Sequence, residues 1–163
     1  MTKVLKIRRT GHVIESLIRN PNKFCPDFGQ LDYENDLVAI QHVFPHKGYF
    51  HGFNFLLRKG TRTNYPPARA SPSDWKTVRL HDHFKDQVCK IEVHANNNST
   101  VGMIKLFALD GTLLLSAGNN TCTEVKDFKL QPGEHIIGVQ GYAPLGDKDA
   151  DIKDIQFVIG RLE

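Results

Sequence analysis

Cysteine is scarce in this chain of 163 residues. Its three cysteines, Cys25, Cys89 and Cys122, are an odd number, lie far apart and include no Cys-x-x-Cys pair. A small secreted scaffold held together by several disulfides is therefore excluded. We expect a reducing, intracellular setting, either cytoplasmic or cytoskeleton-associated, and the alternative is an organelle or secretion by an unconventional route.

Long apolar runs are absent as well. No stretch approaches the roughly 18 consecutive apolar residues that a membrane-spanning helix needs. The first twenty residues lack the uninterrupted apolar core of a secretory signal. We therefore expect neither a membrane span nor a signal peptide.

Strong charge of one sign is missing, because the formal net charge is only +3. A nucleic-acid-binding protein usually gathers its Lys and Arg on one face, and here they are scattered. No nucleic-acid partner is expected. The basic residues that do cluster are interpreted as solvated loop charge: Lys3, Lys6, Arg8 and Arg9, and the group Arg58, Lys59 and Arg62.

Catalytic and metal-binding motifs are also lacking. The chain contains no Gly-x-Ser-x-Gly, His-Glu-x-x-His or Walker glycine loop, so we expect a protein that is not an enzyme and needs no cofactor. A strand over 88–94 would place Cys89 and His94 on opposite faces, which argues against a zinc site there. The remaining metal candidates are interpreted as surface histidines: His42, His46 and His51, and the pair His81 and His83 around Asp82.

What the sequence does contain is one strand pattern repeated three times. LVAIQHV, VCKIEVH and HIIGVQG align at steps of 51 and then 48 residues. The alignment forms two columns of apolar residues, Leu37, Val88 and Ile136 in one and Ile40, Ile91 and Val139 in the other. A period near 50 indicates a supersecondary unit that shares its core with neighbouring copies.

The repeat continues through a second strand in each copy. Phe55, Leu106 and Phe157 occupy one column, and the turn glycines Gly60 and Gly111 match each other. Apolar alternation at period two between turns rich in Gly, Pro, Asn and Asp predicts half-buried strands. Three copies favour a closed prism, because closure removes exposed sheet edges. The predicted fold class is all-β.

One segment near the N-terminus follows a different period. Val13, Ile14, Leu17 and Ile18 recur at helical spacing between Gly11 and Pro21, which predicts a short helix. We expect residues 1–22 to form an N-terminal extension and residues 23–163 to form the prism domain, so that removal of 1–22 leaves the prism folded. The helix either packs on the domain itself or docks onto a partner.

From about Phe24 onward the order of segments resembles that of jacalin-like lectin domains. The resemblance is carried by LVAIQHV, GFNFLLRKG, DQVCKIEVHAN, MIKLFALDGT and FKLQPGEHIIGVQGY, followed by IKDIQFVI. It implies a β-prism of three Greek-key sheets. It also implies sugar binding through a glycine-rich loop near the start and a Gly-x-x-x-Asp loop near the end.

The residues at those loops depart from the family pattern. Gly29 stands where the family has paired glycines, and no Gly in GYAPLGDKDADIKD has an Asp four residues later. The degraded motif leaves the following carbohydrate-binding candidates: Gly29, Gly141, Tyr142, Gly146, Asp147, Asp149 and Asp151.

Two classes of function follow. The first is a non-catalytic interaction or scaffold module, a structural subunit of a larger intracellular assembly such as a cytoskeletal or ciliary one. Its partners are proteins, docked through Val13, Ile14, Leu17 and Ile18 and through the proline-rich 65–74 loop with Tyr65 and Arg69. The alternative is a lectin of the mannose or galactose type, whose partners are glycans.

Overall fold

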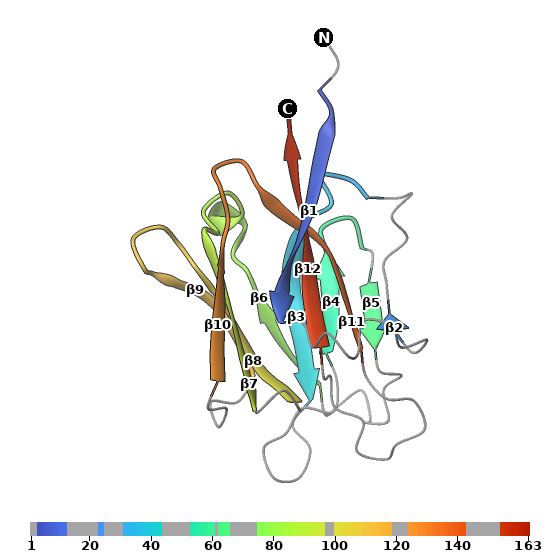
Figure 1. Cartoon of the computed structure of the whole chain (residues 1–163), viewed down its shortest axis with the longest axis vertical. Coiled ribbons are helices and arrows are strands. Elements are labelled where there is room, and N and C mark those ends of the chain that lie inside the picture. The colour runs from blue at the N-terminus through green and yellow to red at the C-terminus, as the bar shows by residue number, and fades with distance from the viewer. Residues whose placement is uncertain are drawn as a thin grey trace.

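The computed structural model describes residues 3–12, 23–24, 31–43, 53–60, 62–65, 75–96, 100–118, 124–142 and 154–163. These residues form three antiparallel sheets of four strands each (Figure 1). The strands surround one apolar core, as expected for a closed prism. The predicted prism of three four-stranded sheets is confirmed.

Sheets B and C are each a Greek key. Sheet B has the order β5-β4-β3-β6 and sheet C the order β10-β7-β8-β9, so that three consecutive strands form a meander and the fourth lies beside the first. The strands of sheet B are β3 (Leu37–Val43), β4 (Phe53–Leu57), β5 (Arg62–Tyr65) and β6 (Trp75–Arg79). A 3-10 turn, η4 (Asp82–Phe84), precedes sheet C, which contains β7 (Lys90–Asn96), β8 (Thr100–Phe107), β9 (Leu113–Gly118) and β10 (Glu124–Lys129).

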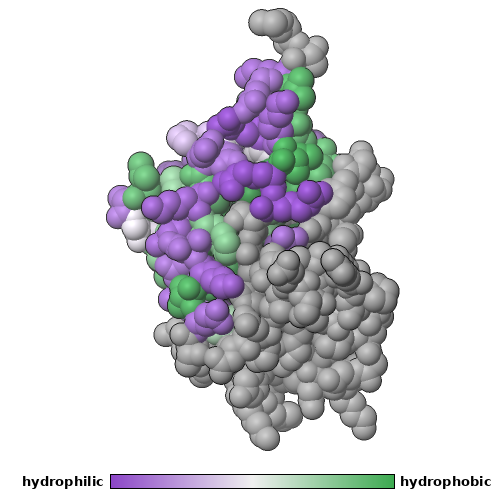
Figure 2. Space-filling view, in the orientation of Figure 1, coloured by the Kyte–Doolittle hydropathy of each residue, from purple (hydrophilic) through white to green (hydrophobic). Residues whose placement is uncertain are grey.

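Sheet A is assembled from both ends of the chain. Its order is β1-β12-β11-β2, with β1 (Leu5–His12), β2 (Lys23–Phe24), β11 (His135–Tyr142) and β12 (Asp154–Leu162). β1 therefore occupies the place that β5 and β9 occupy in the other sheets. Figure 1 shows β1 running alongside β12, with both termini at the same end of the molecule. Figure 2, in the same orientation, shows hydrophilic and hydrophobic residues interspersed over the described part of this face.

This arrangement corrects the expectation for the N-terminal segment. β1 pairs with β12 over eight residues, from Leu5 opposite Leu162 to His12 opposite Ile155. The short N-terminal helix is not seen among the described residues, since the strand continues through Gly11 and His12. The strand forms because pairing with β12 satisfies the backbone groups of Leu5–His12. Val13, Ile14, Leu17 and Ile18 lie outside the described residues.

The threefold repeat is confirmed in the core. Ile40, Ile91 and Val139 are each 0% exposed and belong to one buried cluster, so every sheet contributes its equivalent residue to the core. The turn glycines also match, because Gly60 has φ +90° and Gly111 has φ +89°, a conformation that side chains disfavour. Strand alternation and turn chemistry therefore identified the repeat correctly.

Candidate functional site

Four strands of sheet A begin or finish at the same end of the sheet, here called the sheet A edge. The predicted sugar-binding segment starts there. β11 ends at Tyr142, and β12 begins at Asp154, its direct partner. On either side, His12 at the end of β1 lies opposite Ile155, and Lys23 at the start of β2 lies opposite Tyr142. The 143–153 and 13–22 connections thus leave the same edge of the sheet.

The structure places two of the predicted sugar-binding residues. Gly141 and Tyr142 are the last residues of β11 and pair with β2. Tyr65, a predicted docking residue, ends β5. The other candidates lie outside the described residues: Gly29, Gly146, Asp147, Asp149 and Asp151 for sugar, and Arg69 with the four apolar residues of the 13–18 segment for docking.

The described part of the first predicted sugar loop, residues 31–35, lies at the opposite end of sheet A. β2 is antiparallel to β11, so the chain moves from Lys23 to Phe24 toward the opposite end of the prism. There Tyr33 donates a hydrogen bond from its hydroxyl to the carbonyl of Gly133, at 2.7 Å. Gly133 precedes β11, and Tyr142 ends it, some 25 Å away at the rise of an extended strand. The described part of this segment, 31–35, is therefore remote from Tyr142.

That opposite end, here called the turn end, carries ion pairs that sequence reasoning missed. Arg8 on β1 contacts both oxygens of the buried Glu134 carboxylate, at 2.7 and 2.8 Å, and also the carbonyl of Lys129. The bond from Arg8 lowers the pKa of Glu134 below its usual value. The interpretation of Arg8 as solvated loop charge is wrong, because Arg8 lies on a strand and forms an ion pair with Glu134.

A second ion pair closes the turn end of sheet B. Arg58 donates to the buried carboxylate of Asp36 at 2.7 Å and reaches Asp82 at 3.2 Å, while Lys59 pairs with Asp32 at 2.5 Å. The bond to Asp36 raises the pKa of Arg58. These two residues also contradict the interpretation as free loop charge, since their carboxylate partners come from a distant stretch of chain.

His135 joins all three sheets at the turn end. Its ring stacks on Tyr33, with centroids 4.2 Å apart and planes 8° from parallel. One ring nitrogen lies 2.9 Å from the Asp86 carboxylate and the other 3.3 Å from the carbonyl of Tyr33. These contacts tie the start of β11 to the segments that precede β3 and β7.

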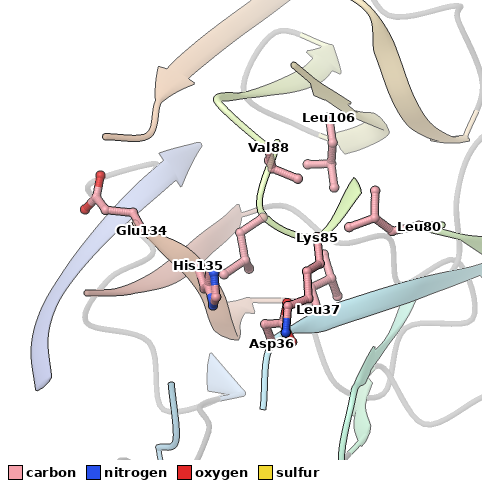
Figure 3. A pocket seen from close by; sticks show the side chains of 9 residues that line it. Asp36, Leu37, Leu80, Lys85, Val88, Leu106, Glu134 and His135 are labelled. Atoms are coloured by element: carbon pink, nitrogen blue, oxygen red, sulfur yellow. The ribbon is translucent and has the colours of Figure 1, made fainter. Parts of the chain in front are cut away.

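A cavity lies beneath this stack (Figure 3). Figure 3 shows the aliphatic side chains of Leu37, Leu80, Val88 and Leu106 around it, while the Glu134 carboxylate turns away. The volume is about 10 Å³, which is room for about one water molecule. A sugar does not fit, so the cavity belongs to the packing of the prism.

The histidines differ from the expectation of surface positions. His81 and His83 are exposed on the η4 turn, as predicted, but His42, His94 and His135 are buried. Within the described residues, no group of three His, Cys, Asp or Glu side chains is placed to hold a metal ion. No helix of that part of the chain is long and apolar enough to cross a membrane.

Comparisons with known proteins support the fold. No family model and no curated protein matches the chain. Among solved structures, the chain is similar to PirB, with a TM-score of 0.59 and 12% identity; the match covers 98% of this chain and 39% of PirB. It is also similar to a lamprey immune protein, with a TM-score of 0.55 and 17% identity; that match covers 97% of this chain and 45% of the lamprey protein. A third similar structure is the prostate-specific WGA16 glycoprotein lectin, with a TM-score of 0.58 and 15% identity; the match covers 85% of this chain and 90% of the lectin. The chain thus spans less than half of PirB and of the lamprey protein.

Proposed function

We propose that the chain is a non-catalytic glycan-binding module whose site lies at the edge of sheet A where Tyr142 and Asp154 meet. The observation that carries the proposal is the convergence there of four strand ends, at His12, Lys23, Tyr142 and Asp154. The likeness to a lectin of similar size, of which the chain covers 90%, supports it.

The chemistry of that edge suits a sugar. Recognition of adjacent hydroxyls requires a carboxylate and backbone N–H groups held in fixed geometry, because water competes for every hydrogen bond. In the sequence, Asp147, Asp149 and Asp151 fall between the paired strands β11 and β12, and Tyr142 is the last residue before this segment. Aromatic rings commonly cover the apolar face of a bound ligand.

A glycan array followed by calorimetry tests this proposal. We expect binding of a mannose- or galactose-type glycan at millimolar affinity or better, and a loss of at least tenfold for Asp149→Ala, Asp151→Ala or Tyr142→Ala. Asp110→Asn, at the turn end, is the matched control and should leave binding unchanged. An array without reproducible binding, or binding that survives all three loop variants, would overturn the proposal.

A second candidate is the role as a structural subunit of a larger, intracellular protein assembly. The observation that favours it is that comparable folds form under half of two longer chains, so the prism also serves as one part of larger proteins. Docking would use the 65–74 loop. Co-purification of partners from cells should be lost with Tyr65→Ala and Arg69→Ala together, while retention of every partner would contradict the candidate.

A further inference from the structure

The three sheets can be compared position by position at the turn end, because the repeat is regular. In sheet B, Asn35 and Asp36 precede β3 and face Arg58 and Lys59, which follow β4. Arg58 forms an ion pair with Asp36, and its backbone N–H donates to the carbonyl of Asp36 at 2.8 Å. The amide oxygen of Asn35 accepts the N–H of Lys59 at 2.7 Å. Side chains and backbone together close this end of sheet B.

Sheet A is closed in a similar way. The residues equivalent to Asn35 and Lys59 are Glu134 and Arg161, as the pairing of Ile136 with Ile159 and of His135 with Gly160 shows. The charge of Arg161, added to the bond from Arg8, lowers the pKa of Glu134. The cation that closes Glu134 is Arg8 of β1, at 2.7 and 2.8 Å, while Arg161 itself donates to Gln131 at 2.7 Å.

Sheet C breaks the pattern. Its equivalent residues are Asp86 and Gln87 before β7, and Leu109 and Asp110 after β8. The basic residues are replaced by a leucine and a second carboxylate, and within the described structure no hydrogen bond or ion pair joins the two sides. The backbone differs too, because the N–H of Ala108 donates to the carbonyl of Thr112, within its own turn.

The result is an open groove, here called the sheet C groove. Asp86, Gln87, Cys89, Ala108, Leu109 and Asp110 line it. Its volume is about 600 Å³, within the range of ligand-binding clefts. The Leu109 side chain is 89% exposed at its rim, and an aliphatic side chain so exposed contributes nothing to the core of this chain.

We propose that the sheet C groove binds a segment of a partner protein that carries a lysine or arginine beside an aliphatic side chain. The chain itself shows the required chemistry twice, since Arg58 pairs with Asp36 in sheet B and Arg8 pairs with Glu134 in sheet A. In sheet C the cation comes from the partner. Its aliphatic neighbour covers Leu109, which removes apolar surface from water.

The two carboxylates of the groove are held in place. One oxygen of Asp86 contacts His135 at 2.9 Å, and one oxygen of Asp110 accepts the N–H of Thr112 at 2.9 Å. The Asp86 side chain is 70% exposed and Asp110 is also exposed, so both carboxylates are accessible to an incoming cation. Two negative side chains lining one groove favour a positively charged ligand.

Titration of the ¹⁵N-labelled full chain with a synthetic peptide, acetyl-Gly-Leu-Lys-Leu-Arg-Gly-amide, tests the proposal by NMR. The charge-reversed peptide, with Glu in place of Lys and Arg, is the ligand control. We expect the basic peptide to shift the amide signals of 86–89 and 108–112 with a Kd below about 1 mM, corresponding to ΔG near −4 kcal/mol, and the acidic peptide to shift neither segment.

The ion pair that closes sheet B can be copied into sheet C to test whether the peptide binds in the sheet C groove. Gln87→Asp with Leu109→Arg places an Arg58-like side chain in the groove, and should weaken the basic peptide at least tenfold while the melting temperature stays the same or rises. Asp110→Asn, which keeps the turn hydrogen bond, should weaken it severalfold. If the double variant unfolds, Asp110→Asn alone decides.

The following outcomes would overturn the proposal. One is no shift with the basic peptide up to several millimolar, and another is equal affinity in the closed variant. A third is concentration-dependent self-association of the wild type, seen by sedimentation and lost in the closed variant, since the occupant would then be a second copy. Glycan binding at the sheet A edge is independent of all three results.

Discussion

The Glu134 carboxylate is buried, and its charge depends on the residues that bond to it. Its side chain is 6% exposed, whereas that of Arg8 is 43% exposed. Besides the two bonds from Arg8, one oxygen accepts the N–H of Gln131 at 2.5 Å. A buried carboxylate that loses its cation keeps the cost of desolvation without the compensating attraction.

Arg8→Met should therefore destabilise the fold by about 1–3 kcal/mol at pH 7. This is less than the loss of one partner of a fully buried ion pair costs, because Arg8 is partly exposed and water screens its charge. Since the pKa of Glu134 is lowered in the folded state, the stabilisation is present above the unfolded pKa and is lost as the pH falls through the folded one. Urea unfolding at pH 7 and pH 3 measures both effects. Lys6→Met, on the same strand, should cost under about 0.5 kcal/mol, and an equal cost for both variants would contradict the account.

Folding stability should depend on pH through His42 as well, and it should again fall as the pH falls. Burial, followed by the charge of Lys76, lowers the pKa of His42 to about 4 from the 6.5 of an exposed histidine. The unfolded chain therefore binds a proton between pH 6.5 and 4 that the folded chain does not. Folding stability contributed by this group falls as the pH falls through that window.

His42→Gln should flatten this part of the pH profile. In the wild type, we expect the free energy of unfolding to drop by an amount on the order of 2 kcal/mol between pH 7 and pH 4 because of His42. Urea titrations at pH 7, 5.5 and 4 measure it, with His83→Gln as the exposed control. Parallel pH profiles for the wild type and His42→Gln would show that His42 is not the responsible group.

At the scale of elements, β1 connects the two ends of the chain. Besides its ladder with β12, Val4 and Glu163 exchange two backbone hydrogen bonds, at 2.7 and 2.9 Å. The side chain of Leu5 lies against Gly160, where an added Cβ would be 3.1 Å from it. Without β1, the backbone of β12 would be an exposed sheet edge.

Deletion of residues 1–12 should accordingly destabilise the prism, and we expect a fall in melting temperature of more than about 10 °C together with aggregation. A truncation that stops before Val4 is the control and should change little. Adding a synthetic peptide of residues 1–12 should restore part of the lost stability. Scanning calorimetry measures all three, and a folded, unchanged protein after the longer deletion would mean that β1 is a removable extension.

The elements divide into those that the sequence could predict and those that it could not. The inner strands were predictable because Ile40, Ile91 and Val139 recur at a regular period and the turns carry glycine. β1 was not, since the pattern that stabilises it belongs to β12, some 150 residues away in the chain. A local helical period in 13–18 gave no information about strand pairing at 5–12.

The functional surfaces follow the same division. The sugar site in the segment after Tyr142 stays a prediction from resemblance, whereas the position of residues 31–35 depends on the direction of β2, which no spacing in the sequence reveals. The burial of His42 was missed because histidine is as common at the surface as in the core. The sheet C groove was detectable in principle, because Leu109 and Asp110 stand where the repeat has Arg58 and Lys59.

At the scale of the whole molecule, a single core joins the three sheets. The buried cluster takes residues from each sheet, so no sheet has a core of its own. Phe55 of sheet B and Phe157 of sheet A meet edge to face at its centre, with ring centroids 6.4 Å apart and planes at 88°. Both residues are 0% exposed. We therefore expect the three sheets to unfold together in one transition.

A double-mutant cycle on this pair tests how strongly sheets A and B depend on each other. Phe55→Leu and Phe157→Leu should each cost about 1–2 kcal/mol, and the double variant should cost less than their sum by about 0.5–1.5 kcal/mol, the strength of an edge-to-face pair. Urea unfolding followed by fluorescence and by circular dichroism measures the cycle and the cooperativity. Additive costs, or transitions that differ between the two probes, would mean that the sheets fold as separate units.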